Sequence, residues 1–204
     1  MIALVDYGIG NLRSVEKAVA AAGGDVQLTE DPTMILAAEK VILPGVGAFG
    51  DGMAGLRQRG LVEVIYTLVQ RRTPLLGICV GMQLLFDASE ELGEYAGLGL
   101  LPGRVCRFPK DADGNLKVPQ TGWNQLLIEQ ETPLLNGLAR GSYAYFNHSY
   151  FCATAEPADI LASTDYGLRY ASVVGRGRLY GVQFHPEKSQ AVGLQILRNF
   201  VERG

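Results

Sequence analysis

One cysteine lies between two glycines at the point where a short apolar run changes to a helical pattern. Residues 73–78 suit a buried strand, and the apolar spacing over residues 80–89 predicts a helix. Gly77 and Gly81 flank Cys79, which gives the Gly-x-Cys-x-Gly pattern of a nucleophile elbow. Such a turn strains the nucleophile's backbone, and flanking glycines remove Cβ atoms that would clash with neighbouring elements. A helix N-terminus also stabilises a thiolate, whereas the alternative for this thiol is a buried structural role.

A thiol nucleophile needs a base, and the base needs a group that orients it. The chain has two histidines, and one of them, His185, ends an apolar run before Pro186. Proline keeps the preceding backbone extended, so His185 and Glu187 point the same way and can approach one site. His148 lies in an aromatic segment and could be a core residue, while Glu187 could be an ordinary carboxylate at a helix start. With the elbow, these residues predict a Cys79–His185–Glu187 triad.

The composition of the chain favours some classes of protein and disfavours others. The 204 residues are enough for one α/β domain, and 48% of them are hydrophobic. The net charge of −3, without a run of basic residues, disfavours nucleic-acid binding. Three cysteines without a Cys-x-x-Cys pair, and only two histidines, predict that no metal is bound. The odd cysteine count and the lack of a signal-like start predict a cytoplasmic protein, and no apolar run is long enough for a membrane span.

Strand and helix patterns alternate through the first half of the chain. Strands are expected over residues 2–6, 26–29, 40–43 and 73–78, and helices over residues 11–22, with Asn11 as N-cap, from Pro32, and over residues 61–72 and 80–89. In the second half, a turn at residues 97–103 precedes expected strands over residues 104–108, 123–128, 143–153, 160–163, 170–174 and 179–184. A polar hairpin is expected at residues 111–114, a turn at residues 175–177 and an amphipathic helix over residues 190–202.

A glycine-rich loop, residues 44–52, follows the third expected strand. It could be a flexible connection, or a loop whose backbone N–H groups come close to a ligand. Because α/β sheets bind ligands beyond the carboxyl ends of their strands, its position favours the second interpretation.

Residues 77–83 and 181–187 together resemble the triad motifs of the class I glutamine amidotransferases. The likeness continues through the motifs at residues 5–12, 44–49, 122–124, 145–150 and 181–189. The first two of these resemble the branch that supplies ammonia for histidine biosynthesis. One departure is Gln120-Thr121, where relatives often carry His-Met.

The resemblance implies an α/β fold with a mixed, mostly parallel central sheet flanked by helices, in one domain over residues 1–204. It also implies that glutamine is hydrolysed through a thioester on Cys79, without a cofactor. His185 would protonate the departing ammonia and then activate water, and Glu187 would hold His185 in place.

The same resemblance implies two donors for the oxyanion. One would be the Val80 N–H, and the other would come from the loop at Val46 and Gly47, through the Val46 N–H. Residues implied to bind the substrate glutamine are Gln83, Ser149, Tyr150 and Gly45.

A partner is implied as well. Ammonia would pass to a separate (β/α)8-barrel cyclase that makes imidazole glycerol phosphate and aminoimidazole carboxamide ribotide. Asn11, Trp123 and Tyr145 would contact this partner, because aromatic residues often anchor interfaces. A core position is the alternative for Trp123.

Three other functions remain open from the sequence. One is a glutaminase serving another amidotransferase, such as one making anthranilate, although the motifs at residues 5–12 and 44–49 argue against it. Another is a thiol peptidase or hydrolase on a similar elbow. The third is a binding module without catalysis, which predicts that Cys79→Ala removes no activity.

Overall fold

The computed structural model describes residues 1–109 and 116–204, so the predicted hairpin at residues 111–114 lies outside the described residues. The helices are α1 (Leu12–Ala21), α2 (Pro32–Ala37), α3 (Phe49–Gln58), α4 (Leu61–Gln70), α5 (Val80–Gln83) and α6 (Gln190–Arg203). Short 3-10 turns are η1 (Pro133–Leu135), η2 (Pro157–Asp159) and η3 (Pro186–Lys188). The strands of the first half are β1 (Ile2–Val5), β2 (Val26–Thr29), β3 (Lys40–Leu43), β4 (Leu75–Ile78), β5 (Phe86–Ser89) and β6 (Tyr95–Ala96). Those of the second half are β7 (Leu101–Arg107), β8 (Gln120–Gln125), β9 (Leu127–Ile128), β10 (Tyr143–His148), β11 (Tyr150–Thr154), β12 (Ile160–Asp165), β13 (Arg169–Arg176) and β14 (Leu179–Val182).

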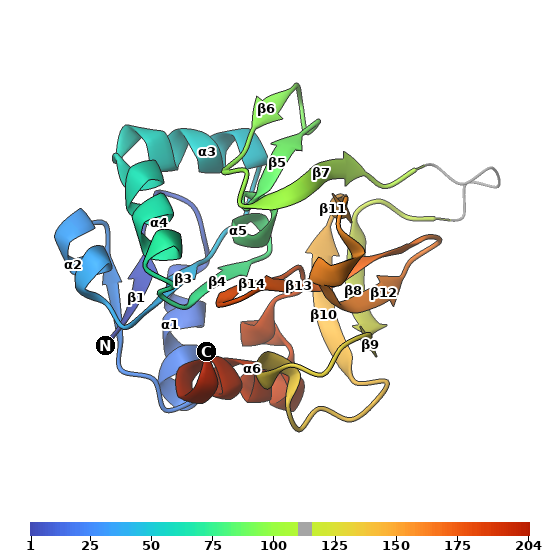
Figure 1. Cartoon of the computed structure of the whole chain (residues 1–204). Coiled ribbons are helices and arrows are strands. Elements are labelled where there is room, and N and C mark those ends of the chain that lie inside the picture. Colours follow the sequence, from blue (N-terminus) through green and yellow to red (C-terminus); the bar gives the residue numbers. More distant parts are fainter. Residues whose placement is uncertain (110–115) are drawn as a thin grey trace.

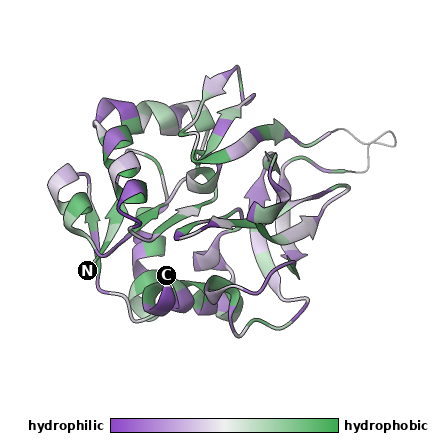
Figure 2. Cartoon of the chain, in the orientation of Figure 1, coloured by the Kyte–Doolittle hydropathy of each residue, from purple (hydrophilic) through white to green (hydrophobic). Residues whose placement is uncertain are grey.

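Five parallel strands form the centre of the larger sheet, in the order β2-β1-β3-β4-β14. The inner strands β1, β4 and β14 are buried along their whole length because both faces of the sheet are covered, whereas β2 lies at the edge and alternates apolar with polar residues. Figure 1 shows α1 and α6 on one face and α3 and α4 on the other. In Figure 2 the central strands are green and the exposed helix faces are purple, which is the distribution that an α/β core requires.

The sheet continues beyond β14 with antiparallel strands β13, β11 and β7, and then β5 and β6. The predicted α/β fold with a mixed central sheet flanked by helices is therefore confirmed. The β13–β14 hairpin is also confirmed, but β13 runs to Arg176, so the turn lies later than predicted.

A second, two-stranded sheet consists of β8 and β10. The predictions of single strands over residues 123–128 and 143–153 are wrong, because the chain changes partners inside each run. The chain leaves the second sheet at Leu126 and again at Ser149. The Ser149 carbonyl accepts from the Phe108 N–H at 3.1 Å. Strand propensity reflects the local sequence, so it does not reveal where a run changes its partner strand.

The predicted helix over residues 80–89 is wrong after Gln83. The carbonyl of Leu84 accepts from the Leu98 N–H at 2.9 Å, and that of Leu85 from the Leu100 and Leu101 N–H groups at 2.8 and 3.0 Å. These carbonyls are therefore committed to a neighbouring segment, and the chain continues as β5. A run that is buried on all sides satisfies either periodicity, so the sequence pattern could not separate helix from strand.

Two further elements differ from the prediction. Helix α3 occupies residues 49–52 of the glycine-rich loop, where a Cβ on Gly52 would lie 3.1 Å from Leu84 Cδ1. Farther along the helix, a Cβ on Gly55 would lie 2.2 Å from the Tyr7 carbonyl oxygen. Strand β7 begins at Leu101, inside the predicted turn.

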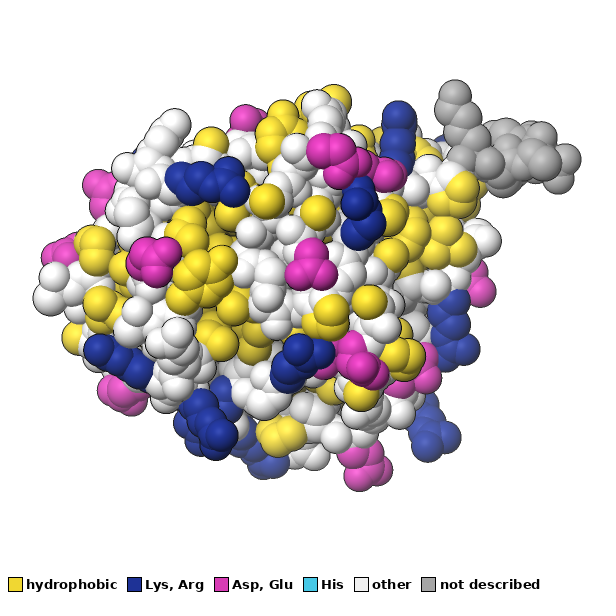
Figure 3. All heavy atoms as spheres, turned by 45° about the horizontal axis from the view of Figure 1, so that its top comes forward, with side chains coloured by type: hydrophobic (Ala, Val, Ile, Leu, Met, Phe, Trp, Pro, Cys, Tyr) yellow, Lys and Arg dark blue, Asp and Glu magenta, His cyan; other side chains and the backbone are white. Residues whose placement is uncertain are grey.

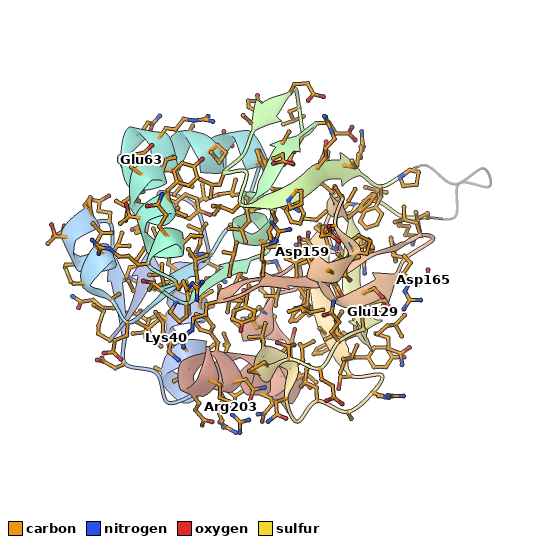
Figure 4. The ribbon with its side chains drawn as sticks, viewed as in Figure 1. Lys40, Glu63, Glu129, Asp159, Asp165 and Arg203 are labelled. Carbon is orange, nitrogen blue, oxygen red and sulfur yellow. The ribbon has the colours of Figure 1, made fainter. Side chains whose placement is uncertain are left out.

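The other expected helices and strands of the first half lie within a few residues of their predicted bounds. Asp31 accepts from the Thr33 N–H at 2.8 Å and caps α2, whereas the Asn11 side chain makes no capping bond to α1. The Lys40 ammonium donates to the carbonyls of Phe200 and Val201, at 2.9 and 2.8 Å, and ties α6 to β3 (Figure 4).

On the surface, Lys and Arg side chains intermingle with Asp and Glu over the face shown in Figure 3. Neither sign of charge dominates this face. Among residues 1–109 and 116–204, no helix has both the length and the apolar character to cross a membrane.

Candidate active site

Cys79 occupies a strained turn between β4 and α5. Its φ of 54° and ψ of −112° lie in a region that residues with a side chain rarely adopt. The Cys79 N–H donates to the Val182 carbonyl at 2.8 Å, so the parallel pairing with β14 extends to the turn itself. The thiol is 4% exposed.

The two flanking glycines are required by close contacts around this turn. A Cβ on Gly77 would lie 2.6 Å from the Gly81 carbonyl oxygen, and a Cβ on Gly81 would lie 1.9 Å from the Leu43 carbonyl oxygen. Both distances are shorter than a van der Waals contact, so only glycine fits at either position. The predicted steric reason for the two glycines is thereby confirmed.

His185 and Glu187 meet beside the thiol. His185 Nδ1 lies 2.9 Å from Glu187 Oε1, and both side chains are almost completely buried. Burial lowers the pKa of His185, but hydrogen bonds with Cys79 and Glu187, and the charges of both partners, outweigh burial and raise this pKa to about 10. The imidazole consequently carries a proton on each nitrogen at neutral pH.

A hydroxyl that the sequence analysis missed fixes the backbone of His185. Ser189 Oγ donates to the His185 carbonyl at 2.7 Å and accepts from the Tyr145 N–H at 2.9 Å. The His185 N–H donates in turn to the Tyr145 carbonyl at 2.9 Å. This buried Ser189 lies four residues after the histidine, in the turn that η3 begins, and that spacing is the signal that could have identified it.

A cavity of about 250 Å³ opens over the thiol. Its lining contains the predicted residues Val46, Gly47, Cys79, Val80, Gln83, Ser149, Tyr150 and His185, together with Glu91, Pro119, Asn147, His148 and Lys188. Glu187 lies behind His185, outside this lining. Eight of the predicted residues, from four separate segments, are thus brought to one hollow at the carboxyl ends of the parallel strands.

In the loop after β3, glycine is needed at positions 45 and 47 for different reasons. Gly45 lies outside the cavity lining, and a Cβ on it would lie 2.8 Å from both the Gly81 nitrogen and the Val80 Cβ. Gly47 lines the cavity at φ +97° with open space around it. The Tyr7 hydroxyl donates to the Pro44 carbonyl and holds the start of the loop. The loop is therefore anchored at its first residues and free at Gly47.

Two glutamines connect the cavity wall to the thiol. Gln83 Nε2 donates to the Tyr150 carbonyl at 3.2 Å and to Gln183 Oε1 at 3.1 Å. Gln183 Nε2 lies 3.8 Å from Cys79 Sγ. The sequence analysis did not identify Gln183, although its place two residues before His185 puts it on the same side of the extended chain.

Glu91 is a second residue that the sequence analysis missed. Its carboxylate lines the cavity and accepts from the Phe49 N–H, at the start of α3, at 2.7 Å. Partial burial raises the pKa of Glu91. Its only sequence signal is an acidic residue just after the elbow segment.

The predicted interface residues lie at the surface next to the cavity. Trp123 is 47% exposed, so it is not a core residue, and its ring meets that of Tyr145 edge-on at 6.1 Å between centroids. The Lys188 ammonium, which lines the cavity, lies 5.7 Å from the centre of the Tyr145 ring. Asn11 is exposed at the start of α1, which packs against η3.

A thiol on an α/β elbow, beside an imidazole that a carboxylate orients, is the arrangement of thiol-dependent hydrolases. The family model of glutamine amidotransferase class-I matches residues 3–203. Two similar relatives are the imidazole glycerol phosphate synthase subunits HisH of Moorella thermoacetica and Dehalococcoides mccartyi. The first is 51% identical over 98% of this chain and 94% of its own length, and the second 53% over 98% and 96%.

Solved structures agree on the fold. A structure described as a glutamine amidotransferase aligns with a TM-score of 0.77 at 19% identity, over 99% of this chain and 98% of its own. PurLQS from Thermotoga maritima aligns with a TM-score of 0.76 at 19% identity, over 98% and 96%. The chain belongs to the class-I glutamine amidotransferase family and, within it, to the HisH subunits.

Proposed function

We propose that this chain is the glutaminase subunit of an imidazole glycerol phosphate synthase and works in the cytoplasm. It hydrolyses glutamine to glutamate and ammonia, and the ammonia passes to a (β/α)8-barrel cyclase. The observation that carries the proposal is the contact of Cys79 with His185, itself bonded to Glu187, at the floor of a cavity. The HisH relatives, at about half identity over nearly the whole chain, support the choice of partner reaction.

In the first half of the reaction, the Cys79 sulfur attacks the side-chain amide carbon of glutamine. A new C–S bond forms, and the carbonyl oxygen becomes an oxyanion. Since His185 holds the proton, it can protonate the amide nitrogen as the C–N bond breaks and ammonia leaves. In the second half, His185 takes a proton from water, the water oxygen attacks the thioester, and glutamate is released with the thiol restored.

The oxyanion receives two backbone donors in this mechanism. The Val80 N–H follows the elbow directly, and the Val46 N–H lies in the loop between Gly45 and Gly47. Val46, Gly47 and Val80 all line the cavity, which supports these roles.

Glutamine lies along the remaining lining. Ser149 and Tyr150 provide backbone groups where the chain passes between the two sheets, and Gln83 supports Tyr150 from behind. Gly45 supports the pocket from beneath, since its lack of a side chain lets the loop approach the elbow. Glu91 places a carboxylate in the lining, where it can pair with the α-ammonium of the substrate.

The cyclase docks on the surface formed by Asn11, Trp123 and Tyr145. The exposed ring of Trp123 and the half-buried ring of Tyr145 beside it are suited to an interface. Lys188 extends this surface from the Tyr145 ring to the cavity. Ammonia released at Cys79 is thereby close to the partner.

The test compares the Cys79→Ser chain with wild type, each mixed with the cyclase. Cys79→Ser should abolish glutamate release while leaving the fold, the complex and the cyclase's use of free ammonia intact. Cys106→Ser is the matched control, because this half-buried thiol lies in β7 outside the cavity. Normal glutamine turnover by Cys79→Ser would refute the mechanism, and glutamine turnover that supports only a different acceptor would refute the assigned partner reaction.

A further inference from the structure

The cavity wall contains a histidine that the mechanism does not use. His148 is 6% exposed, and its Nδ1 lies 2.7 Å from the Tyr150 carbonyl oxygen. Its Nε2 lies 3.2 Å from the Tyr170 hydroxyl. Burial lowers the pKa of His148 to about 4, against a smaller opposing effect of the bond to Tyr150. The ring is therefore neutral at pH 7 and carries one proton.

The partners of His148 determine where that proton lies. A carbonyl oxygen can only accept, so the proton must be on Nδ1 to bond Tyr150. The Nε2 atom is then an acceptor, and the Tyr170 hydroxyl must donate to it. This tautomer is thus imposed by the surroundings of the ring.

The same reasoning extends to Gln120. As placed, Gln120 Oε1 lies 2.8 Å from the Tyr170 hydroxyl oxygen and would accept its proton, in competition with His148 Nε2 at 3.2 Å. A hydroxyl has one proton, and we assign it to His148. Gln120 must therefore donate an amide N–H to that oxygen. An amide turned by 180° provides this donor, since its oxygen and nitrogen exchange places. The turn gives a partner to Gln120 Nε2, which is otherwise buried without one among the described residues, and moves Oε1 to the unpartnered position.

We propose that Gln120, Tyr170 and His148 form a one-directional hydrogen-bond relay that positions the Tyr150 carbonyl and thereby the glutamine-binding wall. The Tyr150 carbonyl receives His148 Nδ1–H and Gln83 Nε2–H, so both of its lone pairs are used. Gln83 in turn holds Gln183 beside the thiol. This inference rests on the proposed glutaminase function.

Gln120 and Tyr170 lie outside the cavity lining, so they are positioning residues and act through His148. Loss of the Tyr170 hydroxyl leaves the buried Nε2 of His148 without a donor, and the Tyr150 wall is no longer held in one orientation. The Cys79–His185–Glu187 contacts do not include these residues. The effect therefore falls on KM for glutamine more than on kcat.

The first test reads the protonation of the ring directly. Nitrogen-15 NMR of the wild-type chain at pH 7 separates the two histidines, and His148→Gln assigns their signals. The relay requires a neutral His148 with the proton on Nδ1. A proton on Nε2, or on both nitrogens, would reverse or break the relay and overturn the proposal.

The second test is glutaminase kinetics of the complex with the cyclase. Tyr170→Phe should raise KM for glutamine roughly tenfold with kcat within about threefold of wild type, and Gln120→Met should change KM in the same direction. Tyr166→Phe is the matched control, because its hydroxyl bonds the Lys117 carbonyl and no member of the relay. An unchanged KM in folded Tyr170→Phe or Gln120→Met, or an equal rise in Tyr166→Phe, would overturn the positioning role. If the wild-type chain does not hydrolyse glutamine, the proposed function is wrong. The NMR measurement of the His148 tautomer still tests the hydrogen-bond relay in that case.

Discussion

At Cys79 the backbone takes a conformation that its own side chain disfavours, and neighbouring residues keep it there. Gly77 and Gly81 make room, and the bond to Val182 anchors the turn. His185 is held in the same way, by Glu187 on its ring and by Ser189 on its backbone. Placement of the thiol and the imidazole is thus determined by contacts from several elements.

The two histidines should respond differently to substitution. His185→Ala should lower the rate of glutamine hydrolysis by at least ~10²-fold, because a general acid–base group is lost. His148→Ala should act more mildly, through glutamine binding or folding. Single-turnover glutamate release by each purified variant measures this difference. Losses of similar size in two well-folded variants would contradict the assignment of His185 as the base.

The sequence predicted the residues of the triad because each carries a local signal, such as flanking glycines or a following proline. Ser189, Gln183 and Glu91 escaped because their relevance comes from contacts made across the fold. A serine or glutamate in isolation has no property that separates a cavity wall from a solvated surface. Functional side chains could therefore be predicted where glycine or proline residues beside them mark a special backbone conformation.

At the scale of elements, the loop after β3 and the short helix α5 both line the cavity and form the two sides of the proposed oxyanion site. The central strands were predictable from apolar runs between turn residues, and β2 and β3 were predicted with the observed bounds. The early end of α5 could not be predicted, since the carbonyls of Leu84 and Leu85, just after the helix, accept hydrogen bonds from residues 98–101. The second sheet could not be predicted either, because its strands end where the chain changes pairing partner, at Leu126 and Ser149.

The loop around Gly47 suggests how the cyclase could activate glutamine hydrolysis. Gly47 has a positive φ and open space around it, so the Val46 peptide can turn toward or away from the cavity. Loss of one oxyanion donor costs on the order of 10²–10³ in rate. We expect the cyclase's ligand to raise kcat for glutamine far more than it lowers KM, because it completes a contact made only in the transition state.

Gly47→Ala should blunt this activation by restricting the loop. Steady-state glutaminase kinetics with and without the cyclase ligand measure it. Gly23→Ala is the matched control, since Gly23 also has a positive φ and open space but follows α1. Activation expressed wholly in KM, or unaffected by Gly47→Ala, would remove the loop from the mechanism of activation.

At the scale of the whole molecule, the cavity and the proposed docking surface lie next to each other. The cavity lies at the carboxyl ends of the parallel strands, and Lys188 joins it to the half-buried ring of Tyr145, which meets the exposed ring of Trp123. The face in Figure 3 carries both signs of charge, so steering by a single-sign field is not a feature of that face.

Trp123→Ala should weaken binding of the cyclase more than it lowers the melting temperature. The side chain is nearly half exposed in the free chain, so its removal leaves little buried space. Calorimetric titration of the cyclase and thermal unfolding of the chain alone measure the two effects. Unchanged affinity together with a large loss of stability would instead assign Trp123 a structural role.

The pH dependence of stability should reveal His148. Its pKa is lowered to about 4 in the folded chain, whereas the unfolded chain has a pKa near 6.5. Stability from the neutral ring is therefore complete above pH 6.5 and is lost as the pH falls toward 4. The free energy of unfolding of wild type should fall more steeply than that of His148→Gln over this range, by up to about 1.4 kcal/mol per pH unit. Urea titrations that give parallel slopes would contradict a buried, neutral His148.

The central claim is that Cys79 carries the acyl group of glutamine. Acid-quenched samples of the complex turning over glutamine can be digested and analysed by mass spectrometry. The account predicts a glutamyl adduct on the peptide that contains Cys79, absent from those of Cys106 and Cys152, and absent in Cys79→Ser. Steady glutamate release with Cys79 unmodified and the adduct on another residue would contradict it.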